Sequence, residues 1–252
     1  MGLFRNSTDS HQHSLEVLTA LVEYDSFLDG LSVIADMGCG AGLDAKWWAE
    51  LETRDEPIEP RNFLVYAVDQ NISQVEPDVL ATPNVVVIEG NFEDRVIPRQ
   101  VDLIWAHDSF QYSRDPFKCL ATWKSMLQVN GMLLMAIPQS TYIDGRTKRL
   151  VVSSHHHEYY SYNLLNLTYM LAINGFDCRD AFFYRKDNSP WLYAGVYASE
   201  HGPIEGQPSW YDLSARQLIS DSLIDSINKY GYARLEDIVV RWFDKDFYRI
   251  SN

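Results

Sequence analysis

The sequence predicts an α/β fold in which a doubly wound, mostly parallel sheet is covered by helices on both faces. Three observations lead to this prediction. Apolar runs of strand length alternate with amphipathic runs of helix length. The strand-like runs are continuously apolar, as in strands that are buried on both faces. The chain has 252 residues, 46% of them hydrophobic, which allows one sizeable core with an appendage.

The first half of the chain supplies most of the sheet. Apolar residues at helical spacing predict a helix over Ser14 to Asp29, ahead of the first strand. The segment 53–62 contains two prolines and reads as a connecting loop. The expected parallel strands are Val33–Ala35, Phe63–Val68, Val85–Ile88, Val101–Ala106 and Met132–Ile137. Helices are expected between some of them, at Leu43–Leu51 and Phe117–Val129.

The second half begins with a helix predicted from Tyr160 to Gly175, where the glycine ends it. Strands at Phe176–Arg185 and Trp191–Ala198 follow. The short link between them predicts a hairpin, so the last strand should run antiparallel to its neighbour. We assign residues 1–202 to one domain and residues 203–252 to a C-terminal extension.

The C-terminal extension is expected to contain a helix over about Leu213 to Tyr230 and a strand-prone tail at Ile238–Phe243. We expect it to pack on the domain or to lie at the interface of a homo-oligomer. The sequence offers no functional account of it.

Composition restricts the possible partners and compartment. A net charge of -14 argues against a protein that binds nucleic acid by neutralising phosphates. The cysteines Cys39, Cys119 and Cys178 lie far apart, which predicts neither a disulfide framework nor a cysteine zinc site. No stretch reaches the ~20 apolar residues that span a bilayer, and the N-terminal segment lacks the apolar centre of a signal peptide. We therefore expect a cytoplasmic protein without a membrane partner.

The most informative segment is the turn after the first strand. An apolar strand ends near Asp36 and passes through Gly38, Gly40 and Gly42 into an amphipathic helix. Glycine tolerates positive φ and lets a ligand approach the backbone closely. A dinucleotide-binding turn has the spacing G-x-G-x-x-G, whose third glycine position is occupied here by Leu43. The carboxylate of Asp36 would also repel a pyrophosphate, whereas it suits a ligand that carries an ammonium group.

The segment Asp36-Met37-Gly38-Cys39-Gly40-Ala41-Gly42 resembles the glycine motif of class I S-adenosylmethionine-dependent methyltransferases. That family has a Rossmann-like sheet of seven strands, of which the last is antiparallel. The resemblance covers roughly residues 30–200. It implies S-adenosyl-L-methionine as cofactor and S-adenosyl-L-homocysteine as product. The cofactor-binding residues that it implies at this turn are Asp36, Gly38, Cys39, Gly40 and Gly42.

Further cofactor contacts are expected after the next two strands. Asp69 ends the second strand, where a carboxylate can accept hydrogen bonds from both ribose hydroxyls; the alternative is a helix N-cap. The adjacent Gln70 should lie near the adenine. Asn91 stands where the family usually has an acidic residue that accepts a hydrogen bond from the adenine amino group. Phe92 offers a backbone amide and an apolar surface to the base, or else packs in the core.

The fourth strand ends at His107 and is followed by Tyr112, and both residues are candidates for catalysis near the methyl group. His107 is a cofactor contact as well, unless it is a hydrogen-bonded structural histidine. This strand and the Asn130-Gly131 pair before the fifth resemble the type 11 subgroup, which is related to the ubiquinone and menaquinone methyltransferases. The chain lacks the Asn-Pro-Pro-Tyr, Asp-Pro-Pro-Tyr and Pro-Cys signatures of enzymes that methylate base amines, glutamine amides or cytosine C5.

A histidine run, His155 to His157, does not predict a metal site, because consecutive side chains cannot converge on one ion. We expect no metal. His157, followed by Glu158 and two tyrosines, resembles instead the substrate-side flap of the family, and it is the third catalytic candidate. The polar segment Gln139–Arg146 follows the fifth strand and is expected to form a lid.

These observations together predict methyl transfer by in-line displacement to a small-molecule acceptor or an exposed side chain. The protein has to align the reactants, and it needs a general base only if the acceptor is protonated. The aromatic residues and the acidic surface suit a cationic or amine acceptor, unless these aromatic side chains pack in the core instead. Two alternatives stay open at this point: a non-catalytic assembly or regulatory protein that keeps the fold, and a nicotinamide oxidoreductase.

Overall fold

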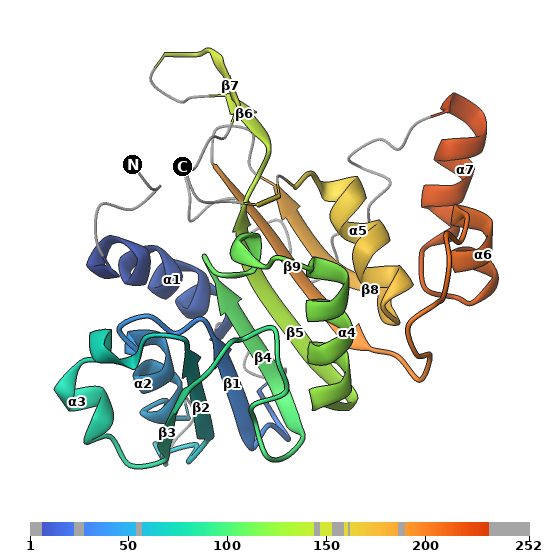
Figure 1. The fold of residues 1–252 in the computed structure, drawn as a ribbon. Helices are drawn as coiled ribbons and strands as arrows, with labels where there is room; N and C mark the ends of the chain where they lie inside the picture. The colour runs from blue at the N-terminus through green and yellow to red at the C-terminus, as the bar shows by residue number, and fades with distance from the viewer. Residues whose placement is uncertain are drawn as a thin grey trace.

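A single sheet of seven strands organises the molecule (Figure 1). The computed structural model describes residues 7–22, 28–53, 57–143, 147–152, 159–160, 162–185 and 190–231. The order of strands is β3-β2-β1-β4-β5-β9-β8. Their bounds are β1 Val33–Met37, β2 Leu64–Asp69, β3 Val85–Glu89, β4 Val101–His107, β5 Leu127–Pro138, β8 Phe176–Arg185 and β9 Trp191–Ala198. The order reverses between β1 and β4, and ligands bind at such a switch point in open α/β sheets.

The predicted doubly wound, mostly parallel sheet with a reversed last strand is confirmed. Strands β1 to β5 run parallel to one another, and β9 runs antiparallel to both of its neighbours, β5 and β8. Along β5 the pairing extends from Met132, opposite Tyr197, to Pro138, opposite Trp191. The last strand of the described chain, β9, is therefore an internal strand of the sheet.

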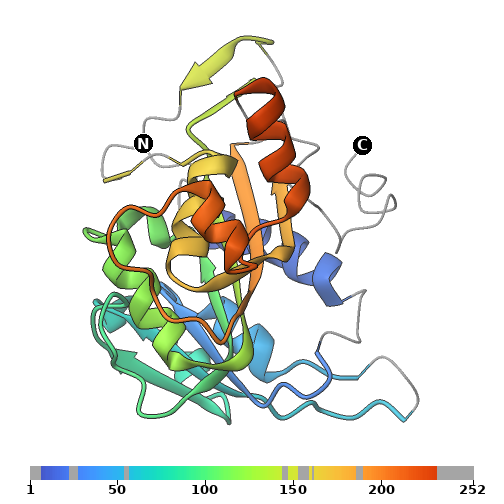
Figure 2. The ribbon, with the colours of Figure 1, turned by 90° about the vertical axis from the view of Figure 1, so that its right-hand side faces the viewer.

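Helices cover both faces of the sheet (Figure 2). On one face, helices α1 (Ser7–Val22) and α2 (Leu43–Ala49) pack through buried residues such as Leu18 and Trp48. On the other face, α4 (Pro116–Met126) and α5 (Leu164–Ile173) pack through Trp123 and Leu171. This two-sided cover explains why the strands are continuously apolar.

Several boundaries differ from the predicted ones, among them the start of α1 and the end of α4. Helix α1 begins at Ser7 rather than Ser14, because residues that read as a polar tail form its first turns. Helix α4 ends at Met126 rather than Val129. Residue Leu127 already pairs with Val101 of β4, and Asn130 has a left-handed φ of 62° at the irregularity where β5 settles into register.

Several short helices and 3-10 helices were not predicted from the sequence. A 3-10 helix η2 (Ile72–Gln74) and α3 (Pro77–Leu80) lie between β2 and β3, where Pro77 at the start of α3 was an available signal. A second 3-10 helix, η3 (Phe110–Tyr112), follows β4. The expected lid segment contributes β6 (Thr141–Ile143), which pairs with β7 (Leu150–Val152) in a hairpin that projects beyond the end of β5 (Figure 1).

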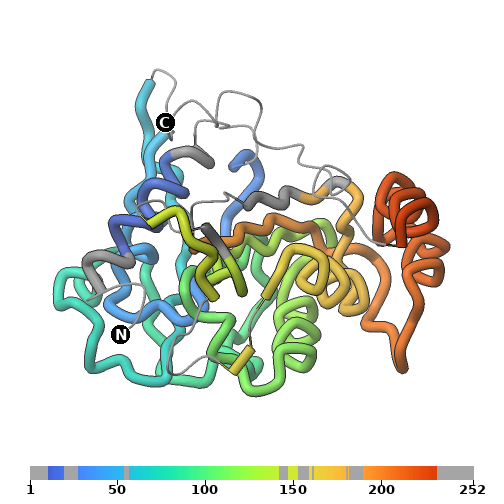
Figure 3. The backbone as a smooth tube through the Cα atoms, turned by 90° about the horizontal axis from the view of Figure 1, so that it is seen from above, coloured from blue at the N-terminus to red at the C-terminus, as the bar shows by residue number. Residues whose placement is uncertain are grey.

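The C-terminal part of the described chain forms two helices instead of one. These are α6 (Trp210–Ala215) and α7 (Asp221–Tyr230), and they lie beside α5 at the β8 end of the sheet (Figure 3). The ring of Trp210 meets that of Tyr169 at 5.1 Å between centroids. The predicted tail Ile238–Phe243 lies outside the described residues. Within the described ranges, every helix is too short or too polar to cross a membrane.

Candidate functional site

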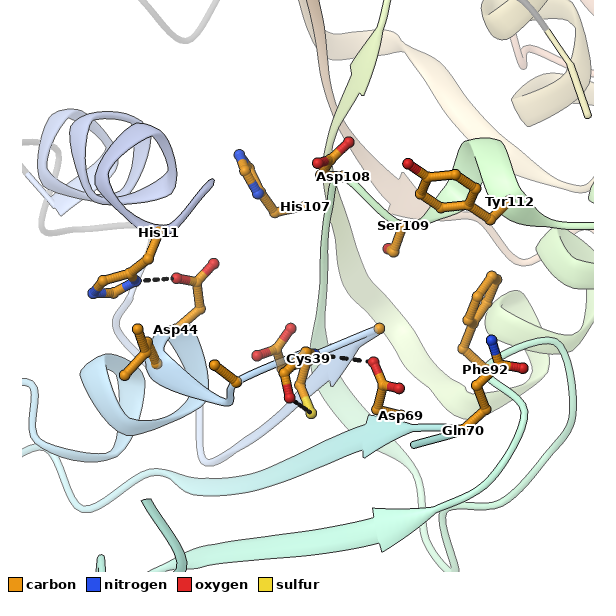
Figure 4. Close-up of a pocket in the computed structure, with 15 residues that line it drawn as sticks. His11, Cys39, Asp44, Asp69, Gln70, Phe92, His107, Asp108, Ser109 and Tyr112 are labelled. Atoms are coloured by element: carbon orange, nitrogen blue, oxygen red, sulfur yellow. Dashed lines mark hydrogen bonds and ion pairs between the residues drawn. The ribbon is translucent and has the colours of Figure 1, made fainter. Parts of the chain in front are cut away.

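A cavity of about 280 Å³ lies at the carboxyl ends of β1, β2 and β4 (Figure 4). The cavity lies at the switch point of the sheet, where the connection after β1 leads toward β2 and the connection after β4 leads toward β5. The residues that line it are His11, Asp36, Gly38, Cys39, Gly40, Ala41, Leu43, Asp44, Asp69, Gln70, Phe92, His107, Asp108, Ser109 and Tyr112.

The glycine turn forms the floor of this cavity. Gly38, Gly40 and Gly42 all have positive φ, at 82°, 52° and 79°. The amides of Gly38 and Cys39 donate to the Val68 carbonyl at 2.8 and 3.0 Å, and the amide of Gly40 donates to Oδ2 of Asp69 at 3.0 Å. Because these amides are already engaged with β2, the turn does not present the row of open N–H groups that a phosphate requires.

Gly38 is also required by close packing. A Cβ atom at this position would lie 2.4 Å from the Cβ of Ser109, which follows β4. The glycine turn and the end of β4 thus touch directly across the floor of the cavity. Any side chain at position 38 would push the two strand ends apart.

Asp36 is a buried carboxyl without a full set of partners. Its side chain is 3% exposed, and its Oδ2 accepts no hydrogen bond from the described residues. Burial, together with the nearby carboxylates of Asp44 and Asp69, raises the pKa of Asp36 well above its usual value. A buried acceptor that lines a cavity in this way is suited to a ligand that brings a donor or a positive charge.

Asp44, in contrast, is satisfied by three donors. His11 Nδ1 lies 2.6 Å from its Oδ1, the Ser14 hydroxyl donates to the same oxygen, and Trp105 Nε1 donates to Oδ2 at 2.9 Å. These bonds hold the pKa of Asp44 below its usual value despite burial. They also fasten α1 to α2 and β4 at one side of the cavity (Figure 4).

His107 belongs to a second group that is built around α1. Its Nε2 lies 2.7 Å from Nδ1 of His13, whose Nε2 lies 2.8 Å from the Tyr193 hydroxyl on β9. The His13 ring stacks on Trp191 at 4.4 Å. Burial lowers the pKa of His13 to about 3 and that of His107 to about 4, so both rings are neutral at pH 7.

Asp108 occupies the position after His107, at the outer part of the cavity. Its backbone has a left-handed φ of 51°, and its amide donates to the Ala136 carbonyl at 2.9 Å. Gln111 Nε2 donates to its Oδ1 at 2.6 Å. Figure 4 shows the hydroxyl of Tyr112 turned toward this carboxyl.

The structure gathers most of the sequence-predicted residues around one cavity. Its lining includes Asp36, Gly38, Cys39, Gly40, Asp69, Gln70, Phe92, His107 and Tyr112. Gly42 begins α2 outside the lining, with Val79 at 2.8 Å from where its Cβ would be. Asn91 is exposed, and its side-chain oxygen accepts from the Glu93 amide at 3.0 Å. His157 lies outside the described residues. The assignment of these residues to cofactor or acceptor stays a prediction.

Several lining residues were not anticipated. Sequence reasoning placed His11 before the first helix, so the contact of α1 with the cavity was not visible. Asp44 reads as an ordinary first-turn helix residue, and only the fold brings Trp105 and His11 to it. Asp108 and Ser109 follow the fourth strand directly, and their position at its carboxyl end was an available signal.

Comparisons with known proteins agree with this architecture. Residues 35–135 match the type 11 family model that is described as a methyltransferase domain. Over 117 residues the chain is 29% identical to the trans-aconitate 2-methyltransferase of Enterobacter sp. (strain 638), a match that spans 45% of this chain and 42% of that protein.

Solved structures with a similar fold include two methyltransferases. The N-methyltransferase NodS from Bradyrhizobium japonicum WM9 is 12% identical with a TM-score of 0.53, over 78% of this chain and 100% of that one. The magnesium protoporphyrin IX methyltransferase from Synechocystis PCC 6803 is 16% identical with a TM-score of 0.54, over 79% and 90%. At these identities the likeness concerns the fold.

Proposed function

We propose that this protein, which carries a class I methyltransferase domain of type 11, transfers a methyl group from S-adenosylmethionine to a small-molecule acceptor or an exposed side chain. The observation that carries the proposal is the carboxyl of Asp36. It is buried at the glycine turn, lines the cavity and has an oxygen without a partner among the described residues. The ammonium group of S-adenosylmethionine supplies the donor that this oxygen lacks.

The remaining lining residues fit the other parts of the same cofactor. Both oxygens of Asp69 accept backbone bonds, from Gly40 and Asn71, and each keeps a lone pair for a ribose hydroxyl. Gln70 and Phe92 lie beyond Asp69 along the cavity wall (Figure 4), and we assign the adenine to this part of the cavity. Gly38 and Gly40 leave room for the amino acid end.

Bound S-adenosylmethionine supplies an electrophilic methyl group on a sulfonium. The chain contributes position and environment: the carboxyls hold the cofactor, and the end of β4 sets where an acceptor can lie. The engaged amides of Gly38, Cys39 and Gly40 argue against the nicotinamide reading, since these three N–H groups are not open to a pyrophosphate.

Relatives do not identify the acceptor. The curated relative is named for trans-aconitate, a carboxylate, whereas NodS is named as an N-methyltransferase. One similar fold therefore hosts transfer to different kinds of atom. The acceptor has to be inferred from the residues of this chain.

Calorimetric titration with S-adenosylmethionine and with S-adenosylhomocysteine tests the proposal. We expect micromolar binding of both, a loss of about 10- to 100-fold in affinity for S-adenosylmethionine in Asp36→Asn, and a similar loss for both ligands in Asp69→Asn. Asp225→Asn, an exposed residue of α7, is the matched control and should bind as the wild type does.

The outcomes of this titration separate the alternatives. Binding that is unchanged in both site variants would show that the cofactor site is elsewhere. Binding without turnover on a broad acceptor panel would favour the non-catalytic reading. Tight binding of NADH in place of S-adenosylmethionine would favour an oxidoreductase.

A further inference from the structure

The outer part of the cavity holds a carboxyl that the cofactor assignment does not use. Asp36 and Asp69 are assigned to S-adenosylmethionine, and Asp44 is occupied by His11, Ser14 and Trp105. Asp108 lies apart from them after the end of β4, near Tyr112 (Figure 4). At this position the Asp108 carboxyl can contact an acceptor that binds in the cavity beside the cofactor.

The carboxyl of Asp108 is held in one orientation. The left-handed φ of 51° turns this residue out of the strand direction, and its amide is fixed by the Ala136 carbonyl. A non-glycine residue in this conformation is uncommon, and aspartate is among the residues that adopt it most readily. Gln111, which is completely buried, clamps Oδ1 at 2.6 Å.

The second oxygen of this carboxyl remains for a ligand. Among the described residues, Gln111 is the one side-chain donor to Asp108, and its bond goes to Oδ1. The residue is half-buried and lines the cavity, so Oδ2 can meet a bound molecule. A carboxylate that is held through one oxygen and open at the other is an oriented acceptor for an N–H or O–H donor.

The charge of the cavity discriminates among acceptors. Four aspartates line it, and none of its lining residues in the described ranges is lysine or arginine. A carboxylate or phosphate acceptor would find no lysine or arginine in this lining to balance its charge. An ammonium group would find the free oxygen of Asp108.

The protonation behaviour of Asp108 agrees with this role. Burial raises its pKa to about 7, and the hydrogen bond from Gln111 offsets part of the effect. The other titratable groups around the cavity are Asp36, Cys39, Asp44, Asp69, His11, His107 and Tyr112. A carboxyl with a pKa near 7 can both pair with a cation and keep a proton at neutral pH.

We propose that the acceptor is a primary or secondary amine, and that Asp108 binds its ammonium form and removes a proton from it before methyl transfer. This proposal rests on the proposed function. In the buried site, loss of hydration disfavours both the ammonium and the carboxylate, so the proton moves from nitrogen to Oδ2 at a lower cost than in water.

The step is balanced in protons and electrons. The N–H bond breaks and its proton stays on the Asp108 carboxyl, which leaves a lone pair on nitrogen. That lone pair forms the new bond to the methyl carbon while the methyl–sulfur bond breaks with its electrons on sulfur, which gives S-adenosylhomocysteine. The product leaves as an N-methylammonium ion, and the proton on Asp108 is released to solvent.

Binding of simple probes to the protein loaded with S-adenosylhomocysteine provides the first test. The probes are methylamine, isobutylamine and benzylamine, with acetate and benzoate as anionic counterparts of similar size. We expect at least one amine to bind the wild type about 10-fold or more tightly than it binds Asp108→Asn. Asp225→Asn again serves as the control and should match the wild type.

Direct titration of the carboxyl provides a readout that does not depend on turnover. The ¹³C carboxyl signal of Asp108, identified by its loss in Asp108→Asn, should titrate near pH 7. In Gln111→Leu this midpoint should move further up, because the donor that favours the carboxylate is gone. A midpoint near the ordinary aspartate value would overturn the proposal.

Turnover distinguishes this proposal from the more general one. With an amine panel and S-adenosylmethionine, N-methylated product should form, and its rate should fall about 100-fold or more in Asp108→Asn. Affinity for S-adenosylhomocysteine should stay at the wild-type value in that variant. Equal amine affinity in wild type and variant, or methylation of carboxylates only, would reject the amine proposal while cofactor binding still stands.

Discussion

Replacing Gly38 by alanine should destabilise the protein more than the same change at Gly40. Both residues have positive φ, at 82° and 52°, and a left-handed conformation costs an L-residue roughly 1–2 kcal/mol. At Gly40 the added Cβ has no heavy atom within 4 Å. At Gly38 it lies 2.4 Å from the Cβ of Ser109, and overpacking adds roughly 1–3 kcal/mol.

We therefore expect a loss of about 2–5 kcal/mol in the free energy of unfolding for Gly38→Ala, against about 1–2 kcal/mol for Gly40→Ala. Urea unfolding followed by circular dichroism measures both values under identical conditions. Domains of ordinary size are stable by about 5–15 kcal/mol, so the expected difference of about 1–3 kcal/mol between the two variants is a large fraction of the total and can be resolved.

A double-mutant cycle isolates the contact with Ser109. In Gly38→Ala/Ser109→Gly the two Cβ atoms no longer collide, so the pair should show a favourable coupling of about 1–3 kcal/mol relative to the sum of the single changes. Equal destabilisation at Gly38 and Gly40, or a coupling near zero, would refute the reasoning that the end of β4 packs directly on the glycine turn.

Two further predictions concern stability elsewhere. Glu93 is buried and accepts from the amides of Arg114 and Asp115 at 3.0 and 3.2 Å, so Glu93→Gln should lower the free energy of unfolding by about 1–3 kcal/mol, whereas the exposed Glu76→Gln should leave it unchanged in the same urea experiment. The pKa values of His13 and His107 are lowered by burial to about 3 and about 4, so between pH 6.5 and pH 4 the unfolded chain binds more protons than the folded one. Stability should fall over that window as the pH drops, and it should fall less in His13→Gln/His107→Gln; a slope that is equal in both proteins would show that these rings are not buried and neutral.

The sheet and the glycine turn were predictable because their signals are local. The strands are continuous apolar runs, and the turn at Gly38, Gly40 and Gly42 is specified by spacing within a few residues. The reversed last strand followed from the short link before Trp191. These features depend little on how distant parts of the chain meet.

The side chains that complete the cavity were less predictable, because distant segments bring them together. His13 meets His107 and Tyr193, which lie 94 and 180 residues away in the sequence, and no spacing rule connects them. At the end of β4 the sequence drew attention to His107, since histidine titrates near neutral pH. Burial lowers the pKa of that histidine to about 4, so the ring is neutral at pH 7. Burial also raises the pKa of the neighbouring Asp108 to about 7.

The place of β9 between β5 and β8 has a consequence for how the chain is made. Strand β5 ends at Pro138, but the segment that covers its edge begins at Trp191. During translation, the ribosome therefore synthesises the apolar Leu133 and Met135 of β5 well before it synthesises their partner strand, β9. An open, apolar strand edge is a template for pairing with other chains. Translation thus passes through an interval in which the nascent protein is exposed to aggregation, and that interval closes when β9 inserts.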